Sequence, residues 1–380
     1  MTIRIAFFEP HYSLHNINDW EIRGSYKYPS LLGDLHERAA ITILMSTLPP
    51  EEDRHRQTLE RDFGASFCQI ATRDDAGEFA GETLFADYAA TIADHTPDIV
   101  STLNGRMIDH NFALARAAND AAVEFVYRMA GNDILTRTSV YEAQGRPVSG
   151  TGFWANLLAQ ERYIAEIART IIVMGGTERV RAESLTSNPG KIRICQRGVD
   201  RDLFTPNARV AERCDRILYL GRNSKEKGID LIEAAAALLV ESRPDLRFTI
   251  AGDFEPHEES NRRYLGFHEY RALPGLYKNH HALLLPARSE GFPQVVMEAM
   301  SCGLPAILSR HLFQHDFEPG QGAALVSLDG AAIAEQVTAL HDDPAGFRAM
   351  REAALATANA RFDAGRNSSL YHDALLGVSA

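Results

Sequence analysis

The chain has 380 residues, of which 45% are hydrophobic and 24% are charged, and this composition is typical of a soluble globular protein. This length is too great for one ordinary hydrophobic core and predicts two domains of common size. The formal net charge of −12 argues against nucleic acid as a partner and against non-specific binding to anionic lipid. It leaves room for a local basic patch, and therefore for a peripheral membrane contact.

The sequence predicts neither a membrane span nor a secretory signal. No apolar run approaches the ~20 residues that a transmembrane helix needs, and residues 2–8 are too few and too quickly followed by polar residues for a signal peptide. The four cysteines show no metal-ligand spacing: Cys68, Cys195, Cys214 and Cys302. We therefore expect a cytoplasmic protein with reduced thiols.

Short β-rich runs alternate with helical patterns along the first half of the chain. Strands are predicted at 3–8, 40–45, 66–70, 99–103, 125–128, 170–174 and 191–195. Helices are predicted at 30–38, 82–95, 110–121 and 153–168. This alternation is typical of a doubly wound parallel sheet with helices on both faces.

After a turn at residues 196–200 the alternation starts again. Strands are predicted at 216–220, 247–251, 281–285 and 306–308, with helices at 229–239 and 294–301. Two successive doubly wound units imply a cleft between them. In open α/β sheets, ligands bind beyond the carboxyl ends of the strands, so the candidate residues should follow strands.

The most informative segment is residues 286–305, which follow the apolar strand 281–285. A Gly291-Phe292-Pro293 turn leads directly into the predicted helix. Free backbone N–H groups and the helix dipole at such a start favour an anion. Two carboxylates, Glu290 and Glu298, bracket the turn, and carboxylates next to a phosphate site can bind hydroxyl groups. The segment therefore predicts a sugar linked to a phosphate as the ligand.

A second loop carries cations at the end of a strand. Gly221 ends strand 216–220, and Arg222 and Lys227 follow on the loop that leads to helix 229–239. Both cations can converge on a diphosphate, because Arg offers a planar fork and Lys a point charge. Such a loop is more often a solvated basic loop, but its place at a strand end beside the Glu290–Glu298 block favours a binding site.

Three other chemistries find no support in the sequence. Asp200-Arg201-Asp202 has the spacing of a metal-binding Asp-x-Asp pair, but it lies in the segment between the two units and does not follow a buried strand. No Gly-x-Gly-x-x-Gly follows the first strand, as a dinucleotide dehydrogenase would require. No Gly-x-Ser-x-Gly elbow of a serine hydrolase is present.

Together these motifs resemble those of GT-B-fold glycosyltransferases of the large retaining family 4. The matching segments are Gly221-Arg222 with Lys227-Gly228, Ala251-Gly252-Asp253, Glu290-Gly291-Phe292-Pro293 with Glu298-Ala299-Met300, and Cys302-Gly303-Leu304-Pro305. Arg197-Gly198-Val199-Asp200 and Arg361-Phe362 match segments between and after the domains. The resemblance extends from about residue 195 to the C-terminus, and the first half matches only in the order of its elements.

The resemblance implies a GT-B architecture of two Rossmann-like domains that face a cleft. Residues 1–195 would form an acceptor-binding domain and residues 196–360 a nucleotide-sugar-binding domain. Residues 361–380 would form a helix that crosses back and packs on the first domain.

The resemblance also implies roles for single residues. Arg222 and Lys227 would bind the donor diphosphate and stabilise the leaving group, Glu290 would bind a hydroxyl of the transferred sugar, and these three would be catalytic. Glu298 would bind the ribose hydroxyls. The remaining donor-binding residues would be Gly221, His268, Gly291, Phe292, Pro293 and Val295, with His268 contacting the base through its backbone. No metal or other cofactor is expected, because the two cations and the helix dipole would neutralise the diphosphate.

The first half departs from the family pattern where relatives carry acceptor-site histidines. A Gly-Gly pair often follows the first strand in the family, but only Gly24 is available here. We expect a polar set at strand ends to bind the acceptor: Asn104, Arg106, Arg128 and Asn132, together with Gly24. The competing interpretation, that these residues cap helices and loops, is about equally supported.

Two functional hypotheses follow. The first is a retaining, metal-independent hexosyltransferase that moves a sugar from a nucleoside diphosphate sugar to a glycan, a lipid-linked acceptor or a small molecule, as in polysaccharide biosynthesis. The alternative is a catalytically inactive nucleotide-sugar-binding or regulatory protein on the same fold. A nucleotide-sugar epimerase is less favoured, because the paired-glutamate block is typical of transferases.

Overall fold

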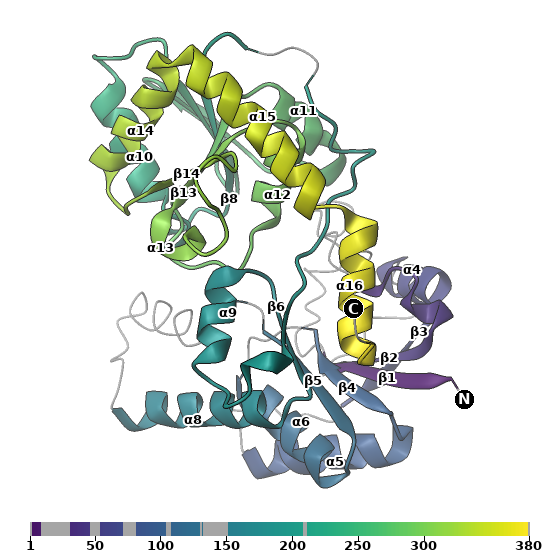
Figure 1. The fold of residues 1–380 in the computed structure, drawn as a ribbon. Coiled ribbons are helices and arrows are strands. Elements are labelled where there is room, and N and C mark those ends of the chain that lie inside the picture. The colour runs from purple at the N-terminus through teal and green to yellow at the C-terminus, as the bar shows by residue number, and fades with distance from the viewer. Residues whose placement is uncertain are drawn as a thin grey trace. The chain divides into compact units, whose positions relative to one another are not determined.

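The structure is a computed structural model that describes residues 2–8, 31–45, 54–70, 81–103, 108–129, 131, 151–207 and 211–378. These residues divide into two compact units, each built around its own sheet (Figure 1). Among the described residues, unit 1 contains the chain up to Cys195 and again from Ser368, and unit 2 contains the chain from Gln196 to Asn367.

Unit 1 contains a seven-stranded sheet in which all paired strands run parallel. The strand order is β3-β2-β1-β4-β5-β6-β7. The strands are β1 (Ile3–Phe8), β2 (Ala39–Met45), β3 (Ala65–Gln69), β4 (Ile99–Thr102), β5 (Glu124–Arg128), β6 (Thr170–Val173) and β7 (Ile192–Ile194). Each lies at or within one residue or so of a predicted strand, because a parallel sheet covered on both faces requires the continuous apolar runs seen in the sequence.

Strand β1 shows why the sheet has a core on each side. Successive side chains of a strand point to opposite faces. Ala6 and Phe8 therefore join one buried cluster, whereas Ile5 and Phe7 join another. Both faces of the sheet are therefore buried, as expected for the doubly wound arrangement that the sequence predicts.

Helices cover both faces of this sheet. They are α4 (Arg54–Phe63), α5 (Gly81–His95), α6 (Ile108–Asp120), α8 (Thr151–Ile167) and α9 (Gly176–Glu183). Helix α6 packs between α5 and α8 and contributes Leu114 to the first core. The other core is completed by the C-terminal helix α16 (Ala364–Leu376).

Unit 2 repeats the design with a second seven-stranded sheet of order β10-β11-β9-β8-β12-β13-β14. The strands are β8 (Arg216–Gly221), β9 (Arg247–Gly252), β10 (His257–Glu259), β11 (Arg262–Leu265), β12 (Ala282–Leu285), β13 (Ala306–Ser309) and β14 (Ala323–Val326). Only the edge pairing of β10 with β11 is antiparallel. The helices are α10 (Ile229–Leu239), α11 (Leu273–Lys278), α12 (Gln294–Ser301), α13 (Arg310–Phe313), α14 (Gly330–Asp342) and α15 (Pro344–Arg361).

One predicted helix is only partly confirmed. A helix was expected around residues 30–38; among the described residues from 31 onward, Leu31 and Leu32 are helical, a turn follows, and Leu35–Glu37 form a short 3-10 helix, η1. Gly33 adopts a left-handed φ of 41°, which ends the helix and which glycine allows without a steric penalty. Helix α9, strands β10, β11 and β14, and helices α11, α13, α14 and α15 had no individual prediction.

The C-terminal helix belongs largely to unit 1, as the predicted crossover required. Tyr371, Ala374 and Leu375 lie in the same buried cluster as residues of β1 and β2. The His372 Nε2 lies 2.8 Å from the carbonyl oxygen of Leu31, so a polar contact adds to the apolar packing. The division between the units falls within this helix, between Asn367 and Ser368.

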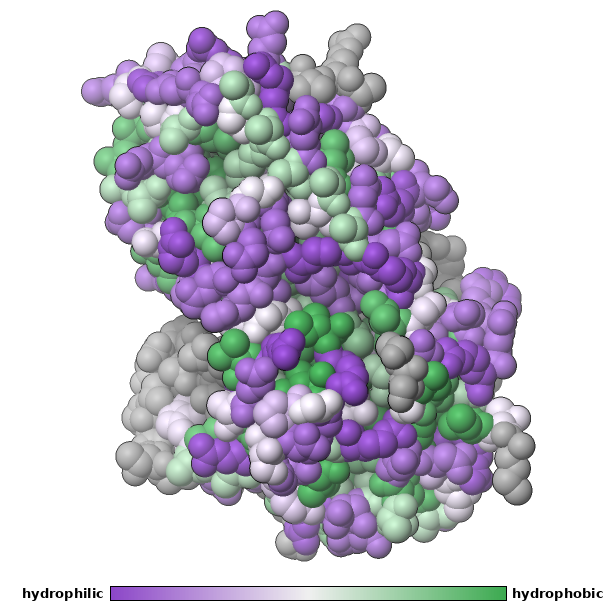
Figure 2. Space-filling model, viewed as in Figure 1, coloured by the Kyte–Doolittle hydropathy of each residue, from purple (hydrophilic) through white to green (hydrophobic). Residues whose placement is uncertain are grey.

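The face of the molecule shown in Figure 2 is mainly polar. Hydrophilic residues cover most of the face shown in Figure 2, and hydrophobic residues form smaller groups among them. None of the helices in the described ranges is long and apolar enough to span a membrane.

The packing of α16 can be tested with two leucines of this one helix. Leu375 is fully buried in the core, so Leu375→Ala should lower the free energy of unfolding by about 2–5 kcal/mol. Leu370 is 41% exposed, and Leu370→Ala should change it by less than about 1 kcal/mol. Urea denaturation of both variants measures the difference. Equal effects would contradict the packing of this helix on the unit 1 sheet.

Candidate functional site

Two strands of unit 2 end side by side at closely spaced glycines. Gly221 at the end of β8 is the register partner of Gly252 at the end of β9. Gly252 has a φ of 141°, and a Cβ built on it would lie 1.9 Å from the carbonyl oxygen of Gly221. A side chain there would collide with backbone, so the close approach of these two loops requires glycine.

A cavity of about 410 Å³ opens at these strand ends and has the size of a small-molecule site. Five residues predicted to bind the donor line it: Gly221, Arg222, His268, Val295 and Glu298. Leu220, Gly252, Asp253, Phe267, Leu273 and Gln294 complete its wall. The structure thus brings together residues that are up to 78 positions apart in the sequence, Leu220 and Glu298. We call this space the donor cavity.

Each cation of the predicted phosphate loop pairs with a carboxylate. The Nη2 of Arg222 lies 3.0 Å from the Oε2 of Glu226, and the Arg222 side chain remains 58% exposed. Lys227 is buried, and its Nζ forms an ion pair with Glu290. Two predicted catalytic residues, Lys227 and Glu290, therefore meet directly, and Arg222 stays free to move toward a ligand.

The loop that carries these cations turns at Gly228. This residue has a left-handed φ of 78°, and a Cβ on it would lie 2.2 Å from the carbonyl oxygen of Pro286. Helix α10 begins immediately after it. The tight turn presses the cationic loop against the segment that follows β12.

Arg288 fastens the same two segments to each other. Its backbone N–H donates to the carbonyl of Glu226 at 2.8 Å, and its guanidinium donates to both oxygens of Asp230 at 2.8 Å. The hydrogen bond from Arg288 lowers the pKa of Asp230. The contact holds the Glu290 loop in a fixed position next to Lys227.

The carboxyl group of Glu298, in the wall of the donor cavity, has a raised pKa. It is 2% exposed, and burial raises its pKa to about 7, although the hydroxyl of Tyr277 donates to its Oε2 at 2.8 Å. Gln294, one turn earlier on α12, also forms a hydrogen bond with it. A buried carboxyl group near its titration point in a cavity wall is typical of a binding site.

Phe292 has a different place from the other predicted donor residues. Its buried ring packs against Phe313, Phe317 and Phe362, with the Arg361 guanidinium 5.8 Å from its centroid. The side chain anchors the turn, so contact with a ligand would have to come from the backbone of Gly291, Phe292 and Pro293. That turn leads into the N-terminus of α12, whose first N–H groups have no partner within the helix.

His268 lines the donor cavity, but its ring is bound to the backbone. Its Nδ1 lies 2.9 Å from the carbonyl oxygen of Gly266. The neighbouring Phe267 also lines the cavity and is 47% exposed. An exposed aromatic side chain in a cavity wall is suited to a flat ring such as a nucleobase.

Several residues of the wall were not among the predicted donor-binding residues. Asp253 was named only as part of a segment that matches the family, but it lines the donor cavity and accepts a hydrogen bond from the backbone N–H of Asn223. Phe267, Leu273 and Gln294 were not singled out. The position of Asp253 after a strand and a glycine was an available signal, because ligands collect at such strand ends.

Most of the predicted acceptor residues lie outside the described part of the chain: Gly24, Asn104, Arg106 and Asn132. Arg128 is described and buried at the end of β5, where its Nη1 donates to the carbonyl of Leu103. Its backbone N–H donates to Thr102 Oγ1 at 2.9 Å. In the structure, Arg128 therefore ties together the ends of β4 and β5.

The Asp-x-Asp sequence serves a local turn. The Oδ1 of Asp200 accepts the backbone N–H groups of Asp202 and Leu203 at 3.0 and 3.2 Å. Within the described ranges, no group of three or more His, Cys, Asp and Glu side chains could hold a metal ion.

Residues 214–343, which contain the donor cavity, match the family model described as glycosyl transferases group 1. Over these residues the chain is similar to that family. The matched range includes Arg222, Lys227, Glu290 and Glu298, so the region of similarity contains the cavity.

Curated relatives match a similar part of the chain. The D-inositol 3-phosphate glycosyltransferase of Pseudarthrobacter chlorophenolicus is 30% identical over 214 residues, which cover 49% of this chain and 50% of the relative. The UDP-Gal:alpha-D-GlcNAc-diphosphoundecaprenol alpha-1,3-galactosyltransferase of Escherichia coli is 28% identical over 37% of this chain and 42% of its own. The chain thus spans about half the length, or less, of these relatives.

Solved structures resemble the fold over the whole chain. Sucrose-phosphate synthase from Thermosynechococcus elongatus has a TM-score of 0.70 at 18% identity and covers 99% of this chain and 100% of its own. Anabaena HepE, solved in complex with UDP and glucose, has a TM-score of 0.70 at 16% identity and covers 98% and 99%. These likenesses confirm the predicted GT-B fold of two doubly wound sheets.

Because the pKa of Glu298 is raised, replacing this residue with the neutral glutamine should increase the free energy of unfolding, and the increase should depend on pH. Between pH 4.5 and about 7 the folded protein keeps a proton that the unfolded chain has lost, so wild-type stability falls as pH rises through this window. The stability of Glu298→Gln does not fall in this window, because glutamine does not titrate. The unfolding free energy of the variant should exceed that of wild type by on the order of 3 kcal/mol at pH 8.5 and by much less at pH 5.

Urea denaturation at the two pH values measures this difference. The exposed Glu352→Gln on α15 is the matched control and should show no such pH dependence. A Glu298→Gln variant that is less stable than wild type at pH 8.5 would show that the buried carboxylate is stabilising.

Proposed function

We propose that this protein is a glycosyltransferase that moves a hexosyl group from a nucleoside diphosphate sugar to an acceptor hydroxyl. One observation carries the proposal: Arg222, Phe267 and Glu298 line a single cavity, and the loop of Arg222 also holds the Lys227–Glu290 pair. A cation, an aromatic surface and a hydroxyl-binding carboxylate are the groups that a nucleotide sugar requires. The similarity of residues 214–343 to the glycosyl transferases group 1 family supports the same chemistry.

Uracil is the best-supported base of the donor. The Escherichia coli relative is named for a UDP-Gal donor. Anabaena HepE has been solved in complex with UDP, with UDP and glucose, and with UDP-glucose. A pyrimidine ring is also small enough to share a cavity of about 410 Å³ with a ribose.

In this proposal each of these residues contacts a particular part of the donor. Glu298, in its ionised form, accepts the ribose hydroxyls, and the ring of Phe267 packs against the base. Arg222 leaves Glu226 for the diphosphate, and Lys227 shares its charge between the diphosphate and Glu290. Glu290, fixed by that pair, accepts a hydroxyl of the transferred sugar. The N-terminus of α12 adds N–H groups and a positive dipole end.

The proposed reaction retains the configuration of the sugar. The bond between the anomeric carbon and the diphosphate oxygen breaks, and the acceptor oxygen forms a new bond on the same face. The departing phosphate oxygen takes the proton of the acceptor hydroxyl, so no protein base is needed. Arg222 and Lys227 stabilise the charge that develops on the leaving group, and we propose that no metal is required.

We propose that unit 1 binds the acceptor, which would be a glycan, a lipid-linked sugar or a small molecule. The candidate residues remain Gly24, Asn104, Arg106, Arg128 and Asn132. The names of the relatives, an inositol phosphate glycosyltransferase and a diphosphoundecaprenol-linked galactosyltransferase, support hydroxyl acceptors that carry a phosphate. A cytoplasmic location, where nucleotide sugars are available, is part of the proposal.

Donor binding provides the first test. UDP and UDP-hexoses, each titrated by calorimetry in EDTA, should bind the wild type and raise its melting temperature. Glu298→Gln should weaken binding about tenfold, because it removes a charged hydrogen-bond acceptor. Glu352→Gln is the control and should bind as wild type does. Binding that appears only with added metal would overturn the metal-free site, and no binding of any nucleotide sugar would overturn the donor cavity.

Turnover separates an enzyme from an inactive binding protein. Release of UDP from a bound UDP-hexose, with or without acceptors, should fall about 100-fold in Arg222→Gln, because charge on the leaving group is no longer stabilised. Lys225→Gln, in the same loop but outside the cavity wall, should retain wild-type turnover. Tight donor binding without turnover across a panel of acceptors would favour the inactive binding protein.

A further inference from the structure

Unit 2 contains a second and larger cavity, of about 600 Å³. Residues of β8, β9, β10, β11 and α11 line it, and it includes the first residues of β8 and β9. The donor cavity, in contrast, lies at the carboxyl ends of these strands. Among the residues that the structure describes, His268 is the one that lines both.

Arginines from neighbouring strands converge on this cavity. Arg216 on β8 and Arg247 on β9 are register partners, and Arg263 on β11 pairs with Thr249, two residues beyond Arg247. Because side chains alternate between faces, all three arginines belong to one face of the sheet. Like charges directly opposite each other destabilise a sheet. An anion bound between the arginines would reduce their mutual repulsion.

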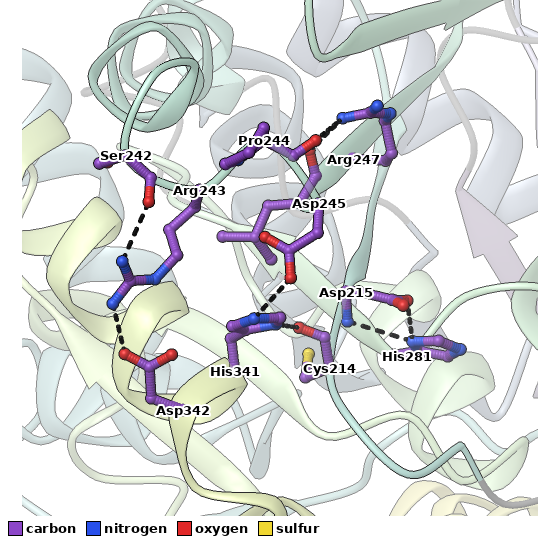
Figure 3. Close-up of polar contacts among 11 residues, drawn as sticks. Cys214, Asp215, Ser242, Arg243, Pro244, Asp245, Arg247, His281, His341 and Asp342 are labelled. Atoms are coloured by element: carbon purple, nitrogen blue, oxygen red, sulfur yellow. Dashed lines mark hydrogen bonds and ion pairs between the residues drawn. The ribbon is translucent and has the colours of Figure 1, made fainter.

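The first two arginines differ in their partners: Arg216 forms an ion pair with Asp215 at 3.8 Å, whereas none of the described carboxylates lies within ion-pair distance of Arg247. The guanidinium of Arg247 donates to the carbonyl oxygens of Pro244 (Figure 3) and Leu246. Arg216 Nη2 lies 2.7 Å from His281 Nε2. A guanidinium only donates, so this imidazole nitrogen accepts the hydrogen bond, and His281 is neutral.

His281 is itself held in place by Asp215, whose Oδ1 lies 2.8 Å from His281 Nδ1 (Figure 3). The nearest distance from Arg216 to that carboxylate is 3.8 Å. This arrangement fixes the direction of the Arg216 side chain without neutralising it closely.

Two more arginines line the cavity with weak surface partners. Arg262 pairs with Glu259 and Arg263 with Glu258, but both glutamates are mostly exposed. The described part of the lining therefore holds four arginines and one carboxylate, Glu258, in a chain whose net charge is −12. His280 adds no charge at neutral pH, because burial lowers its pKa to about 4.

A polar group in the wall completes the site. Asn261 is 4% exposed, and its Nδ2 donates to the carbonyl of Ala236 at 2.9 Å. Its Oδ1 has no hydrogen-bond partner among the residues that the structure describes. A buried acceptor without a donor is costly, and a ligand hydroxyl or an ordered water would satisfy it.

We propose that this space, the basic cavity, binds a phosphorylated small molecule such as a sugar phosphate at a site separate from the donor cavity. Guanidinium groups bind phosphate oxygens in a bidentate manner, which matches Arg216 and Arg247. The volume matches a ligand with more than a bare phosphate. Neither the charges nor the volume depends on the proposed transferase activity.

The shared wall residue gives the basic cavity a route to the donor cavity. A ligand that moves or orders the loop of His268 changes the donor cavity as well, and coupling between two binding sites is reciprocal. The phosphorylated ligand should therefore change donor affinity, and the donor should change the affinity of that ligand by the same factor. This coupling, unlike the site itself, rests on the proposed function.

Titration calorimetry with inorganic phosphate and glucose 6-phosphate tests the site on the full chain. Glucose 6-phosphate should bind more tightly than phosphate, and the double variant Arg216→Gln/Arg247→Gln should weaken it at least about tenfold. Arg222→Gln, which changes the donor cavity, should bind glucose 6-phosphate with an affinity within about twofold of that of wild type. Arg243→Gln is the matched control, because Arg243 pairs with Asp342 outside the basic cavity (Figure 3).

Circular dichroism and melting temperature without ligand show whether the double variant is folded. If it is not, the single variant Arg263→Gln at an exposed position provides the same comparison. Absence of binding to wild type, or loss of binding in Arg222→Gln in place of the double variant, would overturn the proposal. So would arginine-dependent sedimentation with phosphatidylglycerol vesicles in the absence of glucose 6-phosphate binding, since the cluster would then be a membrane contact.

Discussion

The parallel pairing of β8 with β9 and β12 is the constraint on which the site of unit 2 depends. In a parallel sheet every strand delivers its following loop to one edge. The Gly221, Gly252 and Pro286 loops therefore meet, although long stretches of chain separate them. Glycines at positions 228 and 252 allow backbone to approach backbone where any Cβ would collide. Fixed loops in turn fix the cations and carboxylates that they carry.

The cations of the donor cavity and of its adjoining loop are paired with carboxylates. Lys227 is paired with Glu290, and Arg222 with Glu226, while Glu298 is buried and has a pKa raised to about 7. The two pairs differ in exposure, so Arg222 can exchange its partner at little cost, whereas Lys227 is held in one place. In the proposed function, phosphates replace these carboxylates, and no buried cation is left without a partner.

Burial of Glu298 illustrates how a residue that we propose to bind the donor costs stability. A glutamine of the same shape would avoid the cost of burying a charge, yet the ionised carboxylate is the better acceptor for hydroxyl groups. Strained or unfavourable groups of this kind collect at functional sites. The opposed arginines of β8 and β9 also cost stability. They lie at the other end of the sheet, where none of the described carboxylates lies within ion-pair distance of Arg247.

The sequence alone predicted the two doubly wound sheets, and it singled out five residues that line the donor cavity, because apolar runs in parallel strands and glycine turns before a helix are local patterns. It failed at residues 33–38, where one left-handed glycine ended a helix that the apolar pattern had favoured. Only the tertiary structure decided that Asp253 and Phe267 join the donor cavity, that Phe292 is an anchor, and that Arg216 and Arg247 lie opposite each other. Those facts depend on strand order and register, which bring together residues that the linear sequence keeps apart.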